Sequence, residues 1–270
     1  MLHAILLTVI LACAHENPAQ LTVERALSAG PSFSAYLISY QSAGLKLHAM
    51  VAVPTSEMPI DGYPLVIANH GFVPDPRKYG ITADGVDSRP GDYYRSVPEL
   101  YASRGFMVVI PDYRGHNSSE GYDQIAEQNH ESVSLYAEDV VALMAVIGEI
   151  EQADTRNVFM WSHSMGGGVA MRVLLATNIV KAASFWATRD IVDLTPHLVD
   201  LDESIIIQHS LDDSSTAYSN SRNLSKALHA IGHPHTLYSY ESDDHYFKGE
   251  IRELAADRDA AFFRLLIGQP

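Results

Sequence analysis

Short, nearly continuous apolar runs recur along this chain, and they constrain its fold more than any other feature. Each run is four to six residues long. Runs of this kind are typical of parallel strands that are buried on both faces of a sheet. They lie at residues 65–69, 106–111, 158–161, 182–186 and 204–209.

Stretches with helical periodicity lie between these runs. In residues 132–150, for example, apolar side chains recur at three- and four-residue steps. Strands that alternate with helices indicate an α/β fold with a doubly wound, mostly parallel sheet, in which ligands bind at the carboxyl ends of the strands. We also expect an N-terminal antiparallel hairpin (33–40 and 45–54), a last strand (235–240) and helices at 93–105, 165–178, 216–232 and 251–267.

One strand leads into a serine flanked by small residues. The run 158–161 continues as SHSMG at 162–166. A serine on a tight turn between strand and helix is held exposed above the sheet, as in the Gly-x-Ser-x-Gly motif. Here Ser162 replaces the first glycine, and Met165 presents its N–H where negative charge develops beside Ser164. The alternative is a glycine-rich helix start that only packs against a strand.

A serine hydroxyl is a poor nucleophile until a base removes its proton, so Ser164 requires a histidine and an orienting acid. The chain has 13 histidines, so position has to decide among them. In this fold the acid and then the histidine follow the serine, each in a loop after a strand. The loop after 204–209 offers Asp212 and Asp213, and the loop after the last strand offers His245.

The segment NHGF at 69–72 directly follows an apolar run. Gly71 lets the backbone turn there, so that the Phe72 N–H points inward as a second donor for an oxyanion hole. The alternative is an ordinary turn at the end of a strand. With the serine turn also present, we favour the functional interpretation.

Five motifs now occur in the order found in the α/β-hydrolases. The chain most closely resembles bacterial esterases and peptidases allied to the prolyl-oligopeptidase (S9) catalytic domain and to dienelactone-hydrolase-like proteins. The resemblance covers roughly residues 33–267. The motifs are NHGF (69–72), PDYRGHNSSEG (111–121), SHSMGGG (162–168), HSLDD (209–213) and DDHYF (243–247).

The resemblance implies a role for each candidate residue. Ser164 would be the nucleophile, His245 the base and Asp213 the acid of a catalytic triad. Phe72 and Met165 would supply the backbone N–H groups of the oxyanion hole. The chain is then expected to be a single α/β-hydrolase domain over residues 21–270.

The choice of acid also follows from the resemblance. Asp213, and not Asp212, stands four residues beyond His209, which matches the His-Gly-x-x-Asp run of the family. Ser210 replaces the glycine of that run and is a departure from the pattern.

These roles predict a serine hydrolase of the carboxylesterase type that cleaves small-molecule acyl esters and needs no cofactor or metal. Only 17 residues, 187–203, separate two strands between which many relatives insert a lid, so we expect a minimal lid and an open catalytic face. The alternatives are an aminopeptidase or amidase with the same triad, an acyl transferase, and a non-catalytic binding protein of this fold. No acidic pair is placed to bind the α-amine of a peptide, which favours the esterase.

A long loop rich in Pro, Gly and Asp, residues 73–92, lies beside the predicted oxyanion hole. Long loops of this kind are often functional. Arg77, Tyr79 and Arg89 are therefore candidates to line an acyl or leaving-group pocket, and the alternative is a plain surface loop. Three histidines at 229–235 lack the Cys or clustered acids of a metal site.

The net charge of −15 gives a surface that repels phosphate backbones, so we expect no nucleic-acid partner. The apolar run 4–12 is too short to span a membrane as a helix. It resembles a signal peptide over residues 1–14, with lipid attachment at Cys13 as the second processed form. We expect export, the alternatives being a mis-assigned start or a buried N-terminal segment in a cytoplasmic protein. The sequence leaves the oligomeric state open.

Overall fold

A computed structural model of the chain describes residues 20–78, 80–82, 85–86, 94–125, 130–189 and 191–269. The predicted signal peptide, including Cys13, lies outside the described residues. Within the described part, no helix is long and apolar enough to cross a membrane.

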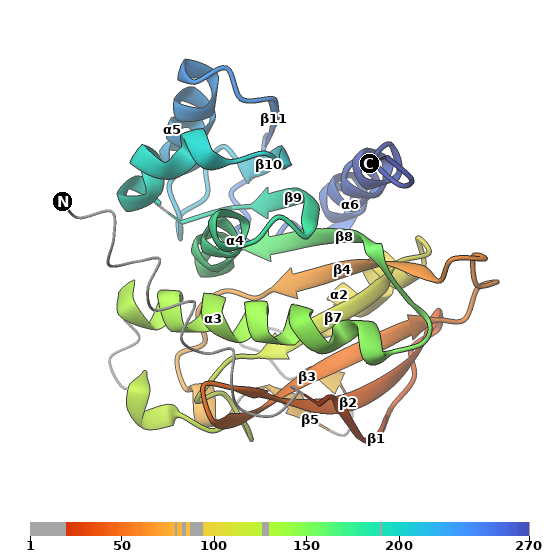
Figure 1. Ribbon diagram of the computed structural model, residues 1–270. Coiled ribbons are helices and arrows are strands. Elements are labelled where there is room, and N and C mark those ends of the chain that lie inside the picture. Colours follow the sequence, from red (N-terminus) through yellow and green to blue (C-terminus); the bar gives the residue numbers. More distant parts are fainter. Residues whose placement is uncertain are drawn as a thin grey trace.

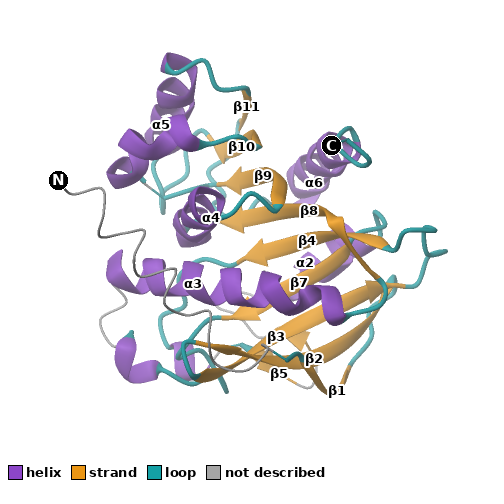
Figure 2. Cartoon of the chain, in the orientation of Figure 1, coloured by secondary structure: helices purple, strands orange, loops and turns teal. Residues whose placement is uncertain are grey.

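A mixed sheet of nine strands forms the centre of the fold (Figures 1 and 2). Its spatial order is β1-β2-β3-β7-β4-β8-β9-β10-β11, and β5 and β6 pair separately. From β7 across β4, β8, β9 and β10 to β11 the pairs are parallel, whereas the pairs β1–β2, β2–β3 and β3–β7 are antiparallel. This confirms the prediction of a mostly parallel sheet with an N-terminal antiparallel hairpin. The strands are β1 (Thr22–Leu27), β2 (Phe33–Ser42), β3 (Leu45–Pro54), β4 (Tyr63–Asn69), β5 (Ile81–Thr82), β6 (Gly85–Val86), β7 (Met107–Asp112), β8 (Ala153–His163), β9 (Val180–Trp186), β10 (Ser204–Ser210) and β11 (His235–Tyr240).

Helices cover both faces of this sheet. Figure 1 shows α3 and α4 lying across one face, with α2 and α6 behind the strands. The α-helices are α2 (Val97–Ala102), α3 (His130–Val146), α4 (Met165–Ala176), α5 (Tyr218–Ala230) and α6 (Gly249–Arg264). The short 3-10 helices are η2 (Pro76–Lys78), η3 (Tyr94–Ser96), η4 (Tyr122–Gln124), η5 (Ile147–Glu149) and η6 (Val192–Asp200).

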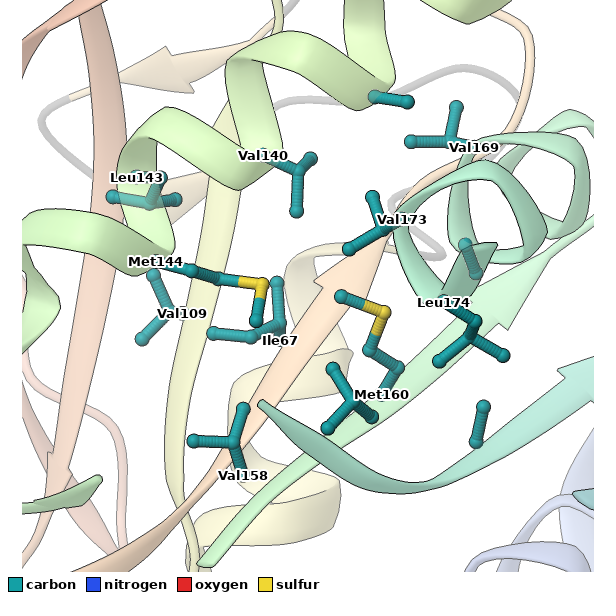
Figure 3. Close-up of a cluster of buried hydrophobic side chains, with 14 of the residues drawn as sticks. Ile67, Val109, Val140, Leu143, Met144, Val158, Met160, Val169, Val173 and Leu174 are labelled. Atoms are coloured by element: carbon teal, nitrogen blue, oxygen red, sulfur yellow. The ribbon is translucent and has the colours of Figure 1, made fainter. Parts of the chain in front are cut away.

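The central strand β4 is buried on both faces, as its apolar sequence predicts. Leu65 and Ile67 belong to the core under α3 and α4, whereas Val66 and Ala68 belong to the core under α2 and α6. Successive side chains of a strand point to opposite faces, so one continuous apolar run supplies both cores. Figure 3 shows the first core, where side chains of α3 and α4 meet those of the strands. The labelled residues are Ile67, Val109, Val140, Leu143, Met144, Val158, Met160, Val169, Val173 and Leu174.

The segment between β9 and β10 contains η6 and no larger inserted element among its described residues. η6 packs against α4 and α5. The prediction of a minimal lid agrees with this arrangement of the described residues between β9 and β10.

Candidate active site

Ser164 occupies a strained turn between β8 and α4. Its backbone has φ 55° and ψ −119°, a conformation that non-glycine residues rarely adopt. Such strain persists only where the surrounding structure enforces it, and it is concentrated at functional sites. The turn places Ser164 at the carboxyl edge of the sheet, where ligands bind in α/β folds.

The glycines that follow let α4 begin in close contact with its neighbours. A Cβ at Gly166 would lie 2.1 Å from the Asn69 carbonyl oxygen, and a Cβ at Gly167 would lie 2.0 Å from Thr188 Oγ1. A side chain at position 166 therefore requires a shift of the backbone, and one at position 167 requires the Thr188 side chain to move. This packing fixes the N-terminus of α4 directly behind the serine turn.

Ser162, which replaces the first glycine of the motif, is fully buried. Its hydroxyl donates a hydrogen bond of 2.9 Å to the Ser184 carbonyl on the neighbouring strand β9. The serine is therefore accommodated because its polar atom has a partner inside the sheet. This departure from the glycine pattern leaves the turn intact.

The predicted oxyanion loop lies against the serine. A Cβ at Gly71 would be 3.0 Å from the Cβ of Ser164, so the backbone of the loop after β4 passes close to the serine. Met165 is the first residue of α4, and its N–H has no partner within the helix. Phe72 follows Gly71, and about half of its side chain (49%) is exposed. The structure thus brings both predicted donor residues to the same edge.

Asp213 and His245 form a direct pair. His245 Nδ1 lies 2.7 Å from Asp213 Oδ2. Because a carboxylate accepts only, Nδ1 carries the proton, and Nε2 of the neutral ring is left as an acceptor. Asp213 follows β10 and His245 follows β11, so two loops far apart in sequence meet at this edge.

The Asp213 carboxylate is held in its charged form by several donors. The N–H groups of Ser215 and Thr216 donate to Oδ1 at 2.8 and 2.9 Å. Burial alone would raise the pKa of Asp213, but hydrogen bonds from His209, His245 and Thr216 outweigh it and lower that pKa below its usual value. The acid is thus a stable acceptor for the imidazole.

The neighbouring residues are arranged differently. Asp212 is exposed, and its backbone N–H donates to the Ser242 carbonyl. Ser210, which replaces the family glycine, donates its hydroxyl to the Asp244 carbonyl at 2.7 Å. That bond ties the end of β10 to the loop that carries His245.

No hydrogen bond joins Ser164 to the His245 ring in the part of the chain that the structure describes. Catalytic hydrogen bonds in free enzymes are often long and tighten only with substrate. The two residues are linked through His163, whose ring centroid lies 4.5 Å from that of His245.

Arg77, the one pocket candidate of the loop 73–92 that the structure describes, is not brought to Ser164. The Arg77 guanidinium lies 3.6 Å above the ring of Tyr122, and no described contact joins it to the serine. Tyr79 and Arg89 lie outside the described residues. The pocket assignment therefore stays a prediction for those two residues.

A cavity of about 460 Å³ lies at the opposite, amino edge of the sheet. Its walls come from residues before β4, from the start of β8 and from the chain after α6, and include Gly62, Asp154 and Gln269. None of the predicted triad residues lines it. Among the described residues, no group of His, Cys, Asp or Glu is arranged to hold a metal ion.

A family model described as "Serine aminopeptidase, S33" (Hydrolase_4) matches residues 75–249. The chain belongs to this family. Its match includes the serine turn and the loops of Asp213 and His245. A curated relative from Bacillus subtilis (strain 168), named "Uncharacterized peptidase YtmA", is 24% identical over 159 residues. That alignment covers 59% of this chain, and the chain spans about half (52%) of the relative.

Solved structures share the fold of this hydrolase-family chain at low sequence identity. The acylaminoacyl peptidase of Pyrococcus horikoshii superposes with a TM-score of 0.67 at 15% identity, covering 88% of this chain but only 42% of that one. An acetyl xylan esterase from Paenibacillus sp. R4 gives 0.66 at 15% identity, covering 91% and 89%. A putative dienelactone hydrolase from Klebsiella pneumoniae gives 0.67 at 16% identity, covering 86% and 99%. These neighbours confirm the predicted resemblance to α/β-hydrolases allied to both groups.

Proposed function

We propose that this chain is a serine hydrolase that cleaves carboxylic acyl esters of small molecules. The observation that carries the proposal is the Asp213–His245 pair, at 2.7 Å, on the same sheet edge as the strained Ser164 turn. Acyl transfer requires a serine hydroxyl as nucleophile and a histidine nitrogen that can accept its proton. Ser164 and His245 Nε2 supply these two groups.

In the proposed reaction, His245 Nε2 takes the proton of the Ser164 hydroxyl as its oxygen attacks the ester carbonyl. The negative charge that forms on the carbonyl oxygen is stabilised by the N–H groups of Phe72 and Met165. His245 then gives the proton to the leaving alcohol, and an acyl-enzyme remains. Water, deprotonated by the same nitrogen, releases the acid and restores the serine. Asp213 keeps the proton on Nδ1 throughout and stabilises the imidazolium.

A peptidase or amidase is the second candidate. The family description and the printed name of the Bacillus subtilis relative both refer to peptidases. The same residues would serve, with an amine in place of the alcohol as the leaving group. The short segment described between β9 and β10 is compatible with either substrate class.

The test is to label the purified protein with a fluorophosphonate and to locate the modified residue by mass spectrometry. We expect labelling at Ser164 and its loss in His245→Ala. Ser162→Ala is a matched control, because Ser162 is a buried serine only two residues away. Absence of labelling in folded protein would contradict the proposal and favour a binding protein of this fold.

Turnover then separates the two enzyme classes. We expect Ser164→Ala to lower kcat for para-nitrophenyl acetate on the order of 10⁴-fold or more. Cleavage of an aminoacyl para-nitroanilide at a rate near that of the ester would favour the peptidase. Cleavage of the ester alone would favour the carboxylesterase.

A further inference from the structure

His163, the residue between Ser162 and Ser164, is fully buried, and both of its ring nitrogens have partners. Nε2 lies 3.0 Å from the His245 carbonyl oxygen. Nδ1 lies 2.8 Å from the hydroxyl of Tyr94. The two contacts point in opposite directions, toward the loops that flank the serine turn.

The chemistry of these partners determines which atom carries the hydrogen in each of these hydrogen bonds. A carbonyl oxygen only accepts, so His163 Nε2 must carry the hydrogen, and Nδ1 of the neutral ring is then an acceptor. The Tyr94 hydroxyl therefore donates to Nδ1. Its oxygen accepts the Gly71 N–H at 2.7 Å. Burial lowers the pKa of His163 well below its usual value, in agreement with a neutral ring.

These bonds form a hydrogen-bonded chain of groups that runs from Gly71 through Tyr94 and His163 to the backbone of His245. One end holds the loop whose next N–H is that of Phe72. The other end holds the main chain of the proposed base. All the groups along the chain are buried, so water does not compete for their hydrogen bonds.

We propose that Tyr94 and His163 are positioning residues that set the distance between the oxyanion loop and the His245 loop on either side of Ser164. This inference rests on the proposed function, because it assigns the pair to that same reaction. Neither side chain touches the reacting atoms. Both act through the backbone, and a small misplacement of such groups costs a large factor in rate.

The kinetic test compares Tyr94→Phe with Tyr101→Phe. Tyr101 is also buried, and its hydroxyl also has a partner, Asp259 at 2.7 Å. Both variants therefore lose a buried phenolic hydrogen bond, but only one loses it beside the serine. We expect Tyr94→Phe to lower kcat for para-nitrophenyl acetate about 10- to 100-fold with little change in KM. Tyr101→Phe should keep the wild-type kcat.

A second variant tests which atoms donate and which accept along this series of hydrogen bonds. In His163→Gln the amide nitrogen takes the place of Nε2 and keeps a donor for the His245 carbonyl, but the acceptor for Tyr94 is lost. It should lose less activity than His163→Ala. Combined with Tyr94→Phe it should lose little more than Tyr94→Phe alone, because both changes break the same link. Losses that simply multiply would overturn the proposal.

A measurement that needs no substrate tests the positioning role of Tyr94 and His163 independently of the proposed function. NMR of isotope-labelled histidine nitrogens should show His163 as the neutral Nε2–H form at about pH 7. Its Nδ1 resonance should shift in Tyr94→Phe and stay in Tyr101→Phe. The Nδ1–H form, or a Tyr94→Phe rate equal to that of Tyr101→Phe, would overturn the inference. A fully active Ser164→Ala would instead overturn the proposed function, while the nitrogen resonances would still decide whether the chain exists.

Discussion

Asp212 and Asp213 are adjacent in sequence but lie in opposite environments. Asp213 is buried and accepts bonds from the His245 ring and from two backbone N–H groups. Asp212 is exposed. Only Asp213 is placed to hold the proton on Nδ1 of His245, as the proposed mechanism requires.

We therefore expect Asp213→Asn to lower kcat on the order of 10⁴-fold, because an amide no longer fixes the imidazole tautomer. Asp212→Asn is the control and should stay within about twofold of the wild type. Ester hydrolysis by the two purified variants, with circular dichroism to verify folding, decides between them. The reverse order of effects would show that the acid was assigned to the wrong residue.

Strand positions in the sequence predicted Ser164, His245 and an acid at Asp212 or Asp213, because the fold brings strand ends together. The choice of Asp213 came from the family resemblance. The sequence did not predict the roles of Tyr94 and His163. Tyr94 meets His163 across 69 residues of sequence, and His163 meets the His245 carbonyl across 82. A local sequence pattern contains no signal for hydrogen bonds between residues so far apart in the sequence. Only the packed sheet edge reveals them.

At the scale of elements, the N-terminus of α4 can pack against β4 only because Gly166 has no side chain. The Cβ of an alanine at Gly166 would lie 2.1 Å from a backbone oxygen of β4. Backbone atoms inside a sheet cannot move aside as the end of a flexible side chain can. Either α4 separates from β4, or the turn at Ser164 changes shape.

We expect Gly166→Ala to lower the free energy of unfolding by about 3 kcal/mol and to abolish the proposed ester hydrolysis in the remaining folded protein. Gly148→Ala is the control, since its new Cβ would meet only Thr155 Cγ2, at 3.3 Å. That variant should stay within about 0.5 kcal/mol of the wild type. Urea unfolding measures both, and equal stabilities would refute the packing argument.

The elements themselves were largely predictable. Residues 45–54 and 235–240 form strands with the predicted bounds. β1 was not predicted, because all of its side chains except Leu27 are exposed and the strand has neither an apolar run nor a buried alternating face. α2 begins later than the predicted start at residue 93, because Pro98 takes a first-turn position of the helix.

At the scale of the whole molecule, one buried carboxylate joins α6 to the rest of the fold. Asp259 is completely buried and accepts four side-chain hydrogen bonds, from Tyr101 of α2, Ser184 and Trp186 of β9 and Gln208 of β10. No cation is among these four partners. Burial therefore raises the pKa of Asp259 to about 7 in spite of its donors.

This shift makes stability depend on pH. An unfolded aspartate has a pKa of about 3.9, so between that value and about 7 the folded state binds the proton more tightly. The contribution of Asp259 is complete below about pH 4 and is lost as the pH rises through about 7. The expected loss is at most about 1.4 kcal/mol per pH unit.

In the variant Asp259→Asn the side chain at this position cannot titrate, so comparison with the wild type isolates the contribution of Asp259 to the pH dependence of stability. The stability of the wild type relative to the variant should fall between about pH 4 and about pH 7, as measured by urea unfolding. Asp112, whose pKa burial also raises to about 7, is present in both proteins and cancels in the comparison. A difference that does not change with pH would contradict the titration of Asp259.

The strand order also determines how a growing chain can fold. β4 lies between β7 and β8, and both of these strands are synthesised after it. A chain released before residue 153 would expose one apolar edge of β4, and such edges pair readily with other molecules. Truncated products should therefore aggregate. The strand that closes this edge also ends in the serine turn, so the protein gains its proposed nucleophile and its protection from aggregation in the same step of folding.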